Sequence, residues 1–194
     1  MQREILKKTY KVILVAIVLI ILLGVLAKVF NLEDKILKKI YPKTYEEYVE
    51  KYAKEYNVDP LLVFSIIKAE SNFNKDAKST SKAKGLMQIV DSTAVEIANK
   101  IDEPIVDETL FDPEKNIMIG TKYYSELLKL YNGNMLLALT AYNAGIGNVK
   151  EWIDNGIIKA DGSDIENIPY KETNMYVRKI IRNYKIYQKL EEKN

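Results

Sequence analysis

An unbroken apolar stretch near the N-terminus constrains this chain more than any other feature. Residues 12–27 read VILVAIVLIILLGVLA without one charged side chain, and the apolar character continues to Phe30. The stretch reaches about the 20 residues that an α-helix needs to cross a bilayer. Because it has no polar face, it is poorly suited to the surface of a water-soluble domain. The sequence therefore predicts a transmembrane helix over residues 12–30.

Charges around this stretch predict its orientation. Basic residues outnumber acidic residues on its N-terminal side, and the positively charged side of a membrane segment usually lies in the cytoplasm. We therefore expect residues 1–11 to form a cytoplasmic tail, and the chain after Phe30 to lie outside a cell membrane that it crosses once. The preceding basic residues are Arg3, Lys7, Lys8 and Lys11, and the acidic residue is Glu4.

Two other interpretations of the stretch remain open. A secretory signal peptide would be cleaved near Ala27, where Val25 and Ala27 provide small residues at a suitable spacing, and the protein would then be secreted. The apolar run is long for a signal-peptide core, which favours a retained anchor. A helix buried in the core of a soluble domain is the third interpretation, and a stretch without a polar face is unusual in a small domain.

The rest of the chain is long enough for one domain. Of 194 residues, roughly 150 follow the membrane segment and a charged stalk over residues 31–43, which is the size of one compact domain with its own core. We place this domain at residues 44–190. The formal net charge of +2 provides no argument for binding nucleic acid.

The sequence contains neither cysteine nor histidine. This excludes disulfides, thiol nucleophiles, zinc sites built from these residues, and catalytic triads that use them. No metal or cofactor is expected. Acid or base chemistry near neutral pH then requires a carboxyl group of raised pKa, a lysine of lowered pKa or a tyrosine.

The spacing of apolar residues after residue 44 is helical. They recur three and four positions apart, and Asp59-Pro60 and Asp112-Pro113 each combine a capping carboxylate with a proline suited to a first helical turn. A mainly α-helical domain follows from this pattern. Helices are expected at 45–56, 60–71, 91–100, 113–131, 134–142, 146–154 and 173–190.

Glu70 is the carboxyl group in the most apolar setting. Val63, Ile66, Ile67 and Glu70 share one face of the helix expected at 60–71, so the carboxyl group is directed along an apolar stripe. Burial without a cationic partner raises a carboxyl pKa, as a general acid requires. The same spacing also allows Glu70 simply to end its helix and reach solvent.

Four motifs, in order, are similar to those of soluble-type lytic transglycosylase (SLT) catalytic domains. They are Glu70-Ser71, GLMQI at 85–89, AYNAG at 141–145, and Glu172-Thr173 followed by Tyr176-Val177. The resemblance covers about residues 44–190 and includes DPEKNI at 112–117. It implies a lysozyme-like, mostly α-helical fold that binds a glycan in a long groove.

The resemblance also implies a reaction. The substrate would be the glycan strand of peptidoglycan, cut at the β-1,4 bond between N-acetylmuramic acid and N-acetylglucosamine. Glu70 would protonate the leaving oxygen and then accept a proton from the C6 hydroxyl of the muramic acid, which yields a 1,6-anhydro product. One carboxyl group would be enough, whereas ordinary glycosidases use two.

Further site residues follow from the same resemblance. Gly85 would allow close backbone approach beside the acid, Gln88 and Asn143 would form hydrogen bonds with sugars, and Tyr142 would stack on a ring. Ser71 and Tyr176 would support the catalytic acid. The substrate-binding residues expected in this way are Ser79, Gly85, Met87, Gln88, Tyr142 and Asn143.

The chain departs from the family pattern after Ile89, where Val90 and Asp91 follow in place of the usual Met-Pro. We expect Asp91 to cap a helix there. A lysozyme-like muramidase would need a second carboxylate or a held water opposite Glu70, and Asp76 and Asp91 are the nearby candidates. A membrane-tethered module that binds peptidoglycan without cutting it is the other alternative. The sequence indicates no particular protein partner.

Overall fold

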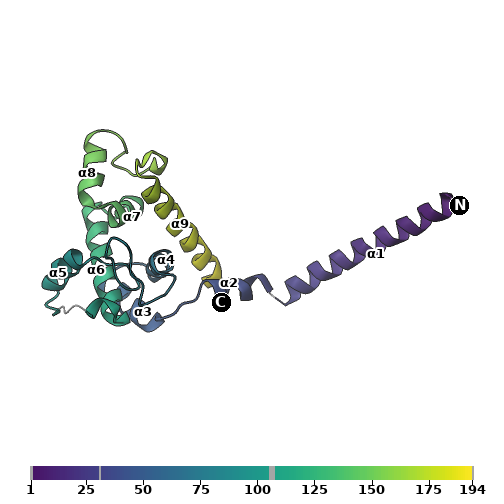
Figure 1. Ribbon diagram of the computed structural model, residues 1–194, viewed down its shortest axis with the longest axis horizontal. Coiled ribbons are helices and arrows are strands. Elements are labelled where there is room, and N and C mark those ends of the chain that lie inside the picture. Colours follow the sequence, from purple (N-terminus) through teal and green to yellow (C-terminus); the bar gives the residue numbers. More distant parts are fainter. Residues whose placement is uncertain (1, 31, 105–107, 194) are drawn as a thin grey trace. The chain divides into compact units, whose positions relative to one another are not determined.

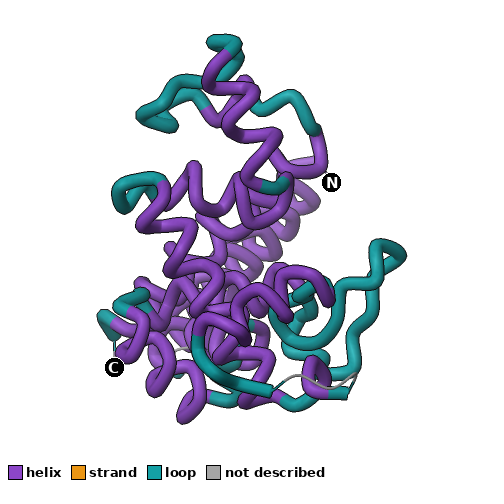
Figure 2. Tube along the Cα trace, turned by 90° about the vertical axis from the view of Figure 1, so that its left-hand side faces the viewer, coloured by secondary structure: helices purple, strands orange, loops and turns teal. Residues whose placement is uncertain are grey.

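A computed structural model describes residues 2–30, 32–104 and 108–193 of the chain. It divides into two compact units, residues 1–42 and residues 43–194. Within the described residues both units consist of helices and loops, and no strand is drawn (Figure 2). The helices are α1 Gln2–Val29, α2 Leu32–Ile40, α3 Glu46–Tyr56, α4 Pro60–Glu70, α5 Asp91–Lys100, α6 Pro113–Leu130, α7 Met135–Ala144, α8 Ile146–Asp154 and α9 Lys171–Glu191, with short 3₁₀ helices η1 Thr109–Phe111 and η2 Ile165–Asn167 (Figure 1).

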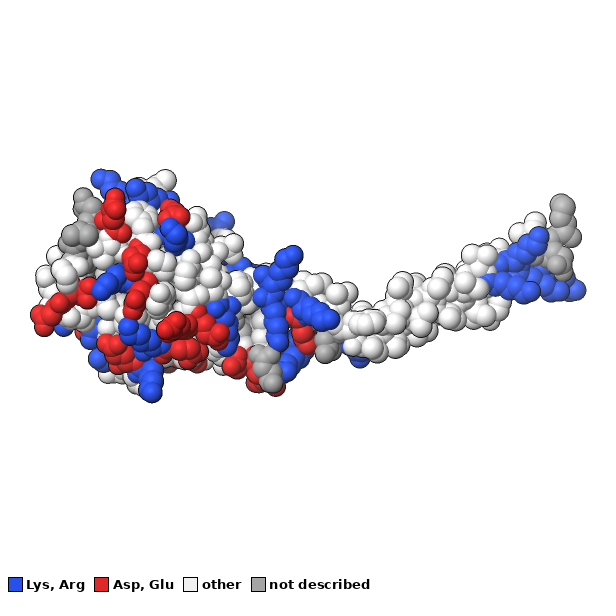
Figure 3. Space-filling view, turned by 90° about the horizontal axis from the view of Figure 1, so that it is seen from below, with Lys and Arg blue, Asp and Glu red and all other residues white. Residues whose placement is uncertain are grey.

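The first unit contains the apolar stretch. Helix α1 begins at Gln2, well before the apolar run at residue 12, because the basic residues in front of the run continue the same helix. Its 25-residue segment Ile5–Val29 is long and apolar enough to cross a membrane. Figure 3 shows an uncharged length of helix with basic side chains at its N-terminal end. Residues 32–40 of the expected stalk form helix α2, with acidic residues in its first turn and lysines in its last, which suits the helix dipole.

The helices of the second unit begin within two residues of the positions that the sequence predicts. Asp59 accepts a hydrogen bond from the backbone N–H of Leu61 at 2.8 Å, and Asp112 accepts one from that of Lys115 at 2.9 Å. In both helices a proline follows the capping residue, where its missing N–H costs nothing. The two predicted caps are therefore confirmed. Gly145, with φ 87°, separates α7 from α8.

The core of the second unit is built around α4. Six consecutive residues of this helix, 62–67, are buried, so α4 is enclosed by its neighbours. It packs chiefly against α9 and also against α3, while α6 contacts α3 and α7. The rings of Phe64 and Tyr187 lie 5.7 Å apart between α4 and α9. This packing places the last residue of α4, Glu70, where it meets α9.

Residues 77–90 form a loop without helix that is held by hydrogen bonds. Backbone bonds join Gly85 to Ala77 at 2.9 Å, and Lys84 to Ile89 in both directions at 3.0 Å. The buried amide of Asn116 on α6 accepts from the N–H of Met87 at 2.7 Å and donates to the carbonyl of Lys84 at 3.0 Å. Because a buried polar group that loses its hydrogen bond is costly, these contacts of Asn116 fix the loop against α6.

The expectation that Asp91 caps α5 was wrong. The helix begins at Asp91 itself, Val90 occupies the capping position, and no side chain caps the helix. Asp91 instead forms an ion pair with Lys84 at 2.6 Å, which ties the start of α5 to the loop. A nearby cation competes for a carboxylate that would otherwise accept from backbone N–H groups.

Candidate active site

A cavity of about 450 Å³ opens between the end of α4, the 77–90 loop, α6, α7 and the start of α9. Five of the residues expected at the site line it, and they come from segments far apart in the sequence. Gly85, Met87, Ser71 and Tyr176 do not line it. The five lining residues are Glu70, Ser79, Gln88, Tyr142 and Asn143.

Glu70 is partly buried and is held by a hydrogen bond. The hydroxyl of Tyr176 on α9 donates to Oε1 of Glu70 at 2.7 Å, which agrees with the supporting role that the resemblance implied for Tyr176. Burial raises the pKa of Glu70 to about 7, against a lowering by this hydrogen bond and by the charge of Lys179. The apolar neighbours of Glu70 on its own helix, Val63, Ile66 and Ile67, are fully buried. Desolvation is therefore the main cause of the raised pKa.

Lys179 is a cation near Glu70 that the sequence argument did not include. Its ammonium group donates a hydrogen bond at 2.6 Å to the backbone carbonyl of Ala69, so it is directed at the end of α4. This contact satisfies one of the carbonyl groups that a helix C-terminus leaves unpaired. The positive charge lowers the Glu70 pKa less than burial raises it.

Tyr142 forms one wall of the cavity and is fixed in place. Its hydroxyl donates to the backbone carbonyl of Met87 at 2.8 Å, which joins α7 to the 77–90 loop. Its ring lies 5.2 Å from that of Tyr123, which also lines the cavity. Burial and the nearby Glu70 raise the pKa of Tyr142 well above its usual value, so the phenol stays protonated at neutral pH. Tyr142 thus offers an aromatic surface and a positioned hydroxyl group rather than a base.

Gln88 reaches the cavity from a backbone conformation that few side chains adopt. Its φ is 50°, in the left-handed region, at a cost of about 1 kcal/mol. The Nε2 group donates to the carbonyls of Ala77 at 3.1 Å and Gly85 at 2.9 Å. The loop thus fixes both the backbone and the amide of Gln88. Its Oε1 remains as the acceptor that a ligand in the cavity can use.

Ser79 lies in an exposed turn at the rim of the cavity. Its hydroxyl accepts from the N–H of Ala83 at 3.0 Å, and the two residues are joined again by a backbone bond of 3.0 Å. The serine is thereby engaged in the turn that shapes this rim.

Gly85 and Met87 stand behind the wall of the cavity, not on its surface. The Met87 side chain is fully buried and packs against Gly120, so it does not reach the surface of the cavity. A Cβ at Gly85, where φ is 76°, would lie 2.1 Å from the carbonyl oxygen of Leu110. Glycine is required there because the loop passes close to η1. Both residues shape the wall from inside the protein.

Ser71 connects the end of α4 to the same loop. Its hydroxyl donates to the carbonyl of Leu86 at 2.8 Å and also approaches that of Ile67 at 3.3 Å. The first contact spans fifteen residues of sequence and fixes the end of α4 beside the 77–90 loop.

The cavity contains residues to which the sequence argument assigned no role. Thr173 donates from its hydroxyl to Oδ1 of Asn143 at 2.7 Å, which orients an amide that is otherwise exposed. Glu172 is an exposed second carboxyl group of the cavity. Glu172-Thr173 belongs to the fourth of the sequence motifs, and only this membership could have indicated from the sequence that the two residues lie at the site. The other lining residues without an expected role include Thr93, Tyr123 and Tyr170.

Asp76 and Asp91, the second carboxylates considered from the sequence, do not line the cavity of Glu70. They line a separate hollow together with Lys78 and Lys84. Each is exposed and forms an ion pair, Asp76 with Lys75 at 2.8 Å and Asp91 with Lys84 at 2.6 Å. Neither has the setting of a second catalytic group opposite Glu70.

Residues 47–163 match the model of the family described as Transglycosylase SLT domain. The match covers more than half of the chain. This chain belongs to the SLT domain family. The resemblance seen in the four sequence motifs is thus confirmed.

Curated relatives in the SLT family have longer chains. The soluble lytic murein transglycosylase of Escherichia coli (strain K12) is 36% identical over 120 residues, covering 60% of this chain and 19% of the relative. Membrane-bound lytic murein transglycosylase C of Yersinia pestis (strain Pestoides F) is 40% identical over 105 residues, covering 48% of this chain and 29% of the relative. The chain thus spans 19% to 29% of the length of these proteins.

Solved structures share the fold. An inactive mutant of the lytic transglycosylase Slt from Pseudomonas aeruginosa, with glutamine in place of a glutamate, matches with a TM-score of 0.74 and 35% identity over 80% of this chain and 26% of its own. The 70 kDa soluble lytic transglycosylase of Escherichia coli matches with a TM-score of 0.72 and 30% identity over 78% of this chain and 25% of its own. The mainly α-helical, lysozyme-like fold expected from the resemblance is confirmed.

Proposed function

We propose that this chain is a membrane-anchored lytic transglycosylase that cuts the β-1,4 bond between N-acetylmuramic acid and N-acetylglucosamine in peptidoglycan. The observation that carries the proposal is the state of Glu70. A carboxyl group with a pKa of about 7, held by Tyr176 and lining an open cavity, is half protonated near neutral pH. It is therefore able both to give and to take a proton there.

The reaction proceeds in two proton transfers through Glu70. The protonated carboxyl group donates to the glycosidic oxygen as the bond from C1 of the muramic acid to that oxygen breaks. The C6 hydroxyl of the same sugar then bonds to C1 and gives its proton to the Glu70 carboxylate. A 1,6-anhydro ring forms, no water is consumed, and Glu70 returns to its protonated state.

The remaining cavity residues hold the sugars. The amide of Gln88 and the amide of Asn143 supply hydrogen bonds to acetamido and hydroxyl groups, and Tyr142 supplies a ring surface. Ser79 contacts the sugar from the rim. Tyr176 and Ser71 position the acid, while Gly85 and Met87 support the wall from behind.

The comparisons support the class of enzyme, and the 1,6-anhydro product and the role of Glu70 are part of the proposal. The curated relatives are named lytic murein transglycosylases, and a glutamate-to-glutamine substitution accompanies inactivity in the Pseudomonas aeruginosa protein. A complex of the 70 kDa soluble enzyme with bulgecin A matches this chain at 32% identity with a TM-score of 0.72.

We further propose that the chain crosses the cell membrane once through α1, with its N-terminus in the cytoplasm and residues 43–194 outside. The apolar length of Ile5–Val29 and the basic residues before residue 12 support this orientation. Protease added to intact spheroplasts is expected to degrade the second unit of the anchored protein. Mass spectrometry of the mature N-terminus distinguishes a retained anchor from cleavage near Ala27.

Product analysis tests the reaction. The full chain in detergent, wild type and Glu70→Gln, is incubated with purified peptidoglycan, and the released muropeptides are weighed by mass spectrometry. We expect products without a reducing end that are lighter by one water than hydrolysis products, and none from the variant. Binding without release by the wild type would indicate a non-catalytic module and overturn the proposal.

A hydrolase is the second candidate, because Glu172 lines the cavity together with Glu70. A muramidase would use Glu172 to hold or activate water, and its products would carry reducing ends. Glu172→Gln is then expected to abolish release. In the transglycosylase mechanism the same variant retains the 1,6-anhydro products, since Glu70 alone carries both proton transfers.

A further inference from the structure

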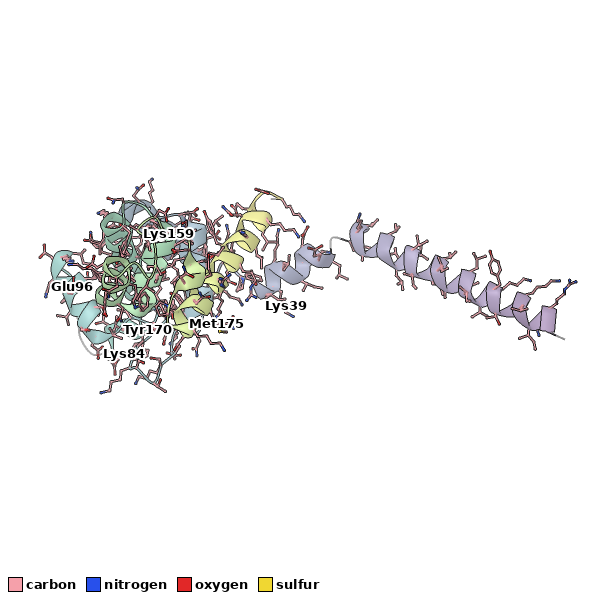
Figure 4. All side chains as sticks on the ribbon, turned by 90° about the horizontal axis from the view of Figure 1, so that it is seen from above. Lys39, Lys84, Glu96, Lys159, Tyr170 and Met175 are labelled. Atoms are coloured by element: carbon pink, nitrogen blue, oxygen red, sulfur yellow. The ribbon has the colours of Figure 1, made fainter. Side chains whose placement is uncertain are left out.

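The cavity of Glu70 continues along α9 into a second hollow of about 490 Å³. The two hollows share Glu70, Asn143 and Glu172, so a ligand in the first extends into the second without leaving the protein surface. Met175, labelled in Figure 4, lies on α9 in the wall of the second hollow. Three cations line this hollow with the two carboxyl groups, and they are Arg178, Lys179 and Arg182.

A third hollow of about 570 Å³ continues from the second, and the two share Arg178 and Arg182. Its lining adds the basic residues Lys185 and Lys189 and contains no carboxyl group. Positions 178, 182, 185 and 189 are four, three and four residues apart, so they share one helix face. All four residues are exposed, and we call this set, Arg178, Arg182, Lys185 and Lys189, the basic face of α9.

Most of these cations lack a carboxylate partner within the protein. In the part of the chain that the structure describes, Arg178, Lys179, Arg182 and Lys185 form no ion pair. Arg178 donates to the amide of Asn174 at 2.8 Å, which is a neutral acceptor. Lysines elsewhere on this unit do pair, for example Lys51 with Glu114 at 2.7 Å. Like charges in a row repel each other, so the basic face favours an anionic ligand.

We propose that the basic face of α9 binds the carboxylates of the peptide stem that is attached to the muramic acid beside the scissile bond. This assignment rests on the proposed function. When the glycan lies in the first cavity, the stem leaves the sugar next to Glu70 and the second hollow receives it. Arginine binds a carboxylate through two parallel hydrogen bonds, and a stem peptide carries several such groups.

The dimensions and the apolar residues of this face suit a short peptide. From Arg178 to Lys189 the helix rises by roughly 16 Å, which is the length of about five extended residues. Ile165, Ile181 and Ile186 line the third hollow between the charges and offer contact to the methyl groups of alanine. The face therefore presents alternate charged and apolar contacts over the length of one stem.

Two substrates separate this role from catalysis on the glycan. One is peptidoglycan with its stems, and the other is the same glycan after an amidase has removed the peptides. The double variant Arg178→Gln/Arg182→Gln of the full chain is expected to lose roughly 10-fold in kcat/KM on the stem-bearing substrate. On naked glycan it should stay within about twofold of wild type, because no stem is present to contact the arginines.

A matched control and a fold check complete the experiment. Lys54→Gln removes a charge from an exposed residue of α3 that lines none of these hollows, and it is expected to change neither rate. Thermal unfolding of the double variant should match wild type, since both arginines are exposed. Raising the salt concentration should reduce the wild-type advantage on the stem-bearing substrate.

Each other outcome overturns the assignment in a recognisable way. Equal losses on both substrates would mean that the arginines position the glycan or the fold, and no loss on either would mean that the face has no part in stem binding. A double variant that keeps its rates and loses a wild-type preference for vesicles of anionic over neutral lipid would identify a lipid-binding face instead. Wild type that cuts neither substrate would refute the proposed function itself.

Discussion

The carboxyl group of Glu70 is subject to opposing influences that decide its chemistry. Burial favours the neutral form, while the Tyr176 hydroxyl and the Lys179 charge favour the ionised form. The result is a pKa of about 7, well above the value of about 4.3 for an unperturbed glutamate. A carboxyl group whose pKa is close to the solution pH gains and loses a proton easily. Because its pKa is higher in the folded than in the unfolded chain, ionisation of Glu70 makes the folded state less stable.

Replacing Glu70 by glutamine is therefore expected to stabilise the protein at alkaline pH. Glu70 has a higher pKa in the folded than in the unfolded state, so wild-type stability is full below about pH 4.3 and is lost as pH rises through about 7. Glu70→Gln lacks this loss. Urea unfolding should show the variant more stable than wild type by about 1–3 kcal/mol at pH 8. At pH 4 the two should agree, and an equal difference at both pH values would contradict the assignment.

Removing the hydroxyl of Tyr176 is expected to change both the rate and its pH dependence. Tyr176→Phe removes a hydrogen bond that stabilises the ionised form of Glu70, so the pKa of Glu70 rises further. In a plot of kcat/KM against pH, the midpoint of the descending limb should shift from about pH 7 to higher pH. The value of kcat should fall roughly 10-fold because the acid is less well positioned.

Tyr48→Phe is the matched control for this substitution, since Tyr48 is a half-buried tyrosine on α3 outside the cavity lining. It should leave the pH limb in place. If Tyr176→Phe lowers kcat without moving the limb, the tyrosine acts on the fold and not on the protonation of Glu70.

At the scale of elements, the 77–90 loop forms part of the cavity wall, and its position depends on contacts with neighbouring helices. Contacts from three helices converge on it, namely Ser71 at the end of α4, Asn116 on α6 and Tyr142 on α7. Each of these side chains binds a backbone group of the loop. The loop thus has little secondary structure of its own and is nevertheless fixed by its neighbours.

Alanine at Gly85 is expected to disturb this element strongly. The new Cβ would lie 2.1 Å from the carbonyl oxygen of Leu110 and 2.3 Å from the amide nitrogen of Asn116. Gly133→Ala is the matched control, because φ is similar at 80° and nothing lies within 4 Å of its Cβ. Chemical denaturation should give a loss of about 1 kcal/mol at Gly133 and about 3 kcal/mol or more at Gly85. Similar losses at both positions would show that the loop moves away from η1 without cost.

At the scale of the whole molecule, the chain separates a unit that contains the long apolar helix α1 from a unit with its own core. The buried apolar residues of the described chain begin at Val49, within the second unit. In the first unit, α1 exposes its apolar side chains along its length. Such a helix is long and apolar enough to cross a membrane, whereas the second unit buries its apolar side chains against one another.

A fragment of residues 43–194 is therefore expected to fold without the first unit. Its circular dichroism melting temperature should lie within about 2 °C of the transition that the full chain shows in detergent, because this unit has its own buried core. Its rate on soluble glycan fragments should be unchanged, while sedimentation with membranes should be lost. A molten or aggregated fragment would show that the first unit contributes to the fold.

Local chemistry is the part of this protein that its sequence determined by itself. The bilayer-length helix, the capped starts of α4 and α6, and the helical spacing of the core follow from side chains close together in the chain, so patterns of three to four residues predict them. The apolar stripe below Glu70 is of the same kind. The absence of cysteine and histidine likewise limits the possible acid and base groups to carboxyl groups, lysines and tyrosines, whatever the fold.

Tertiary structure alone decided which distant groups meet. Lys179 approaches Glu70 from α9, more than a hundred residues away, and Glu172 joins it in the cavity. Met87, expected at the ligand, is buried behind the wall because α6 has a glycine at residue 120 to receive it. Such pairings depend on how helices pack, and local spacing carries no information about them. The raised pKa of Glu70 depends on both, since the sequence places the acid on an apolar face and the packing removes it from water.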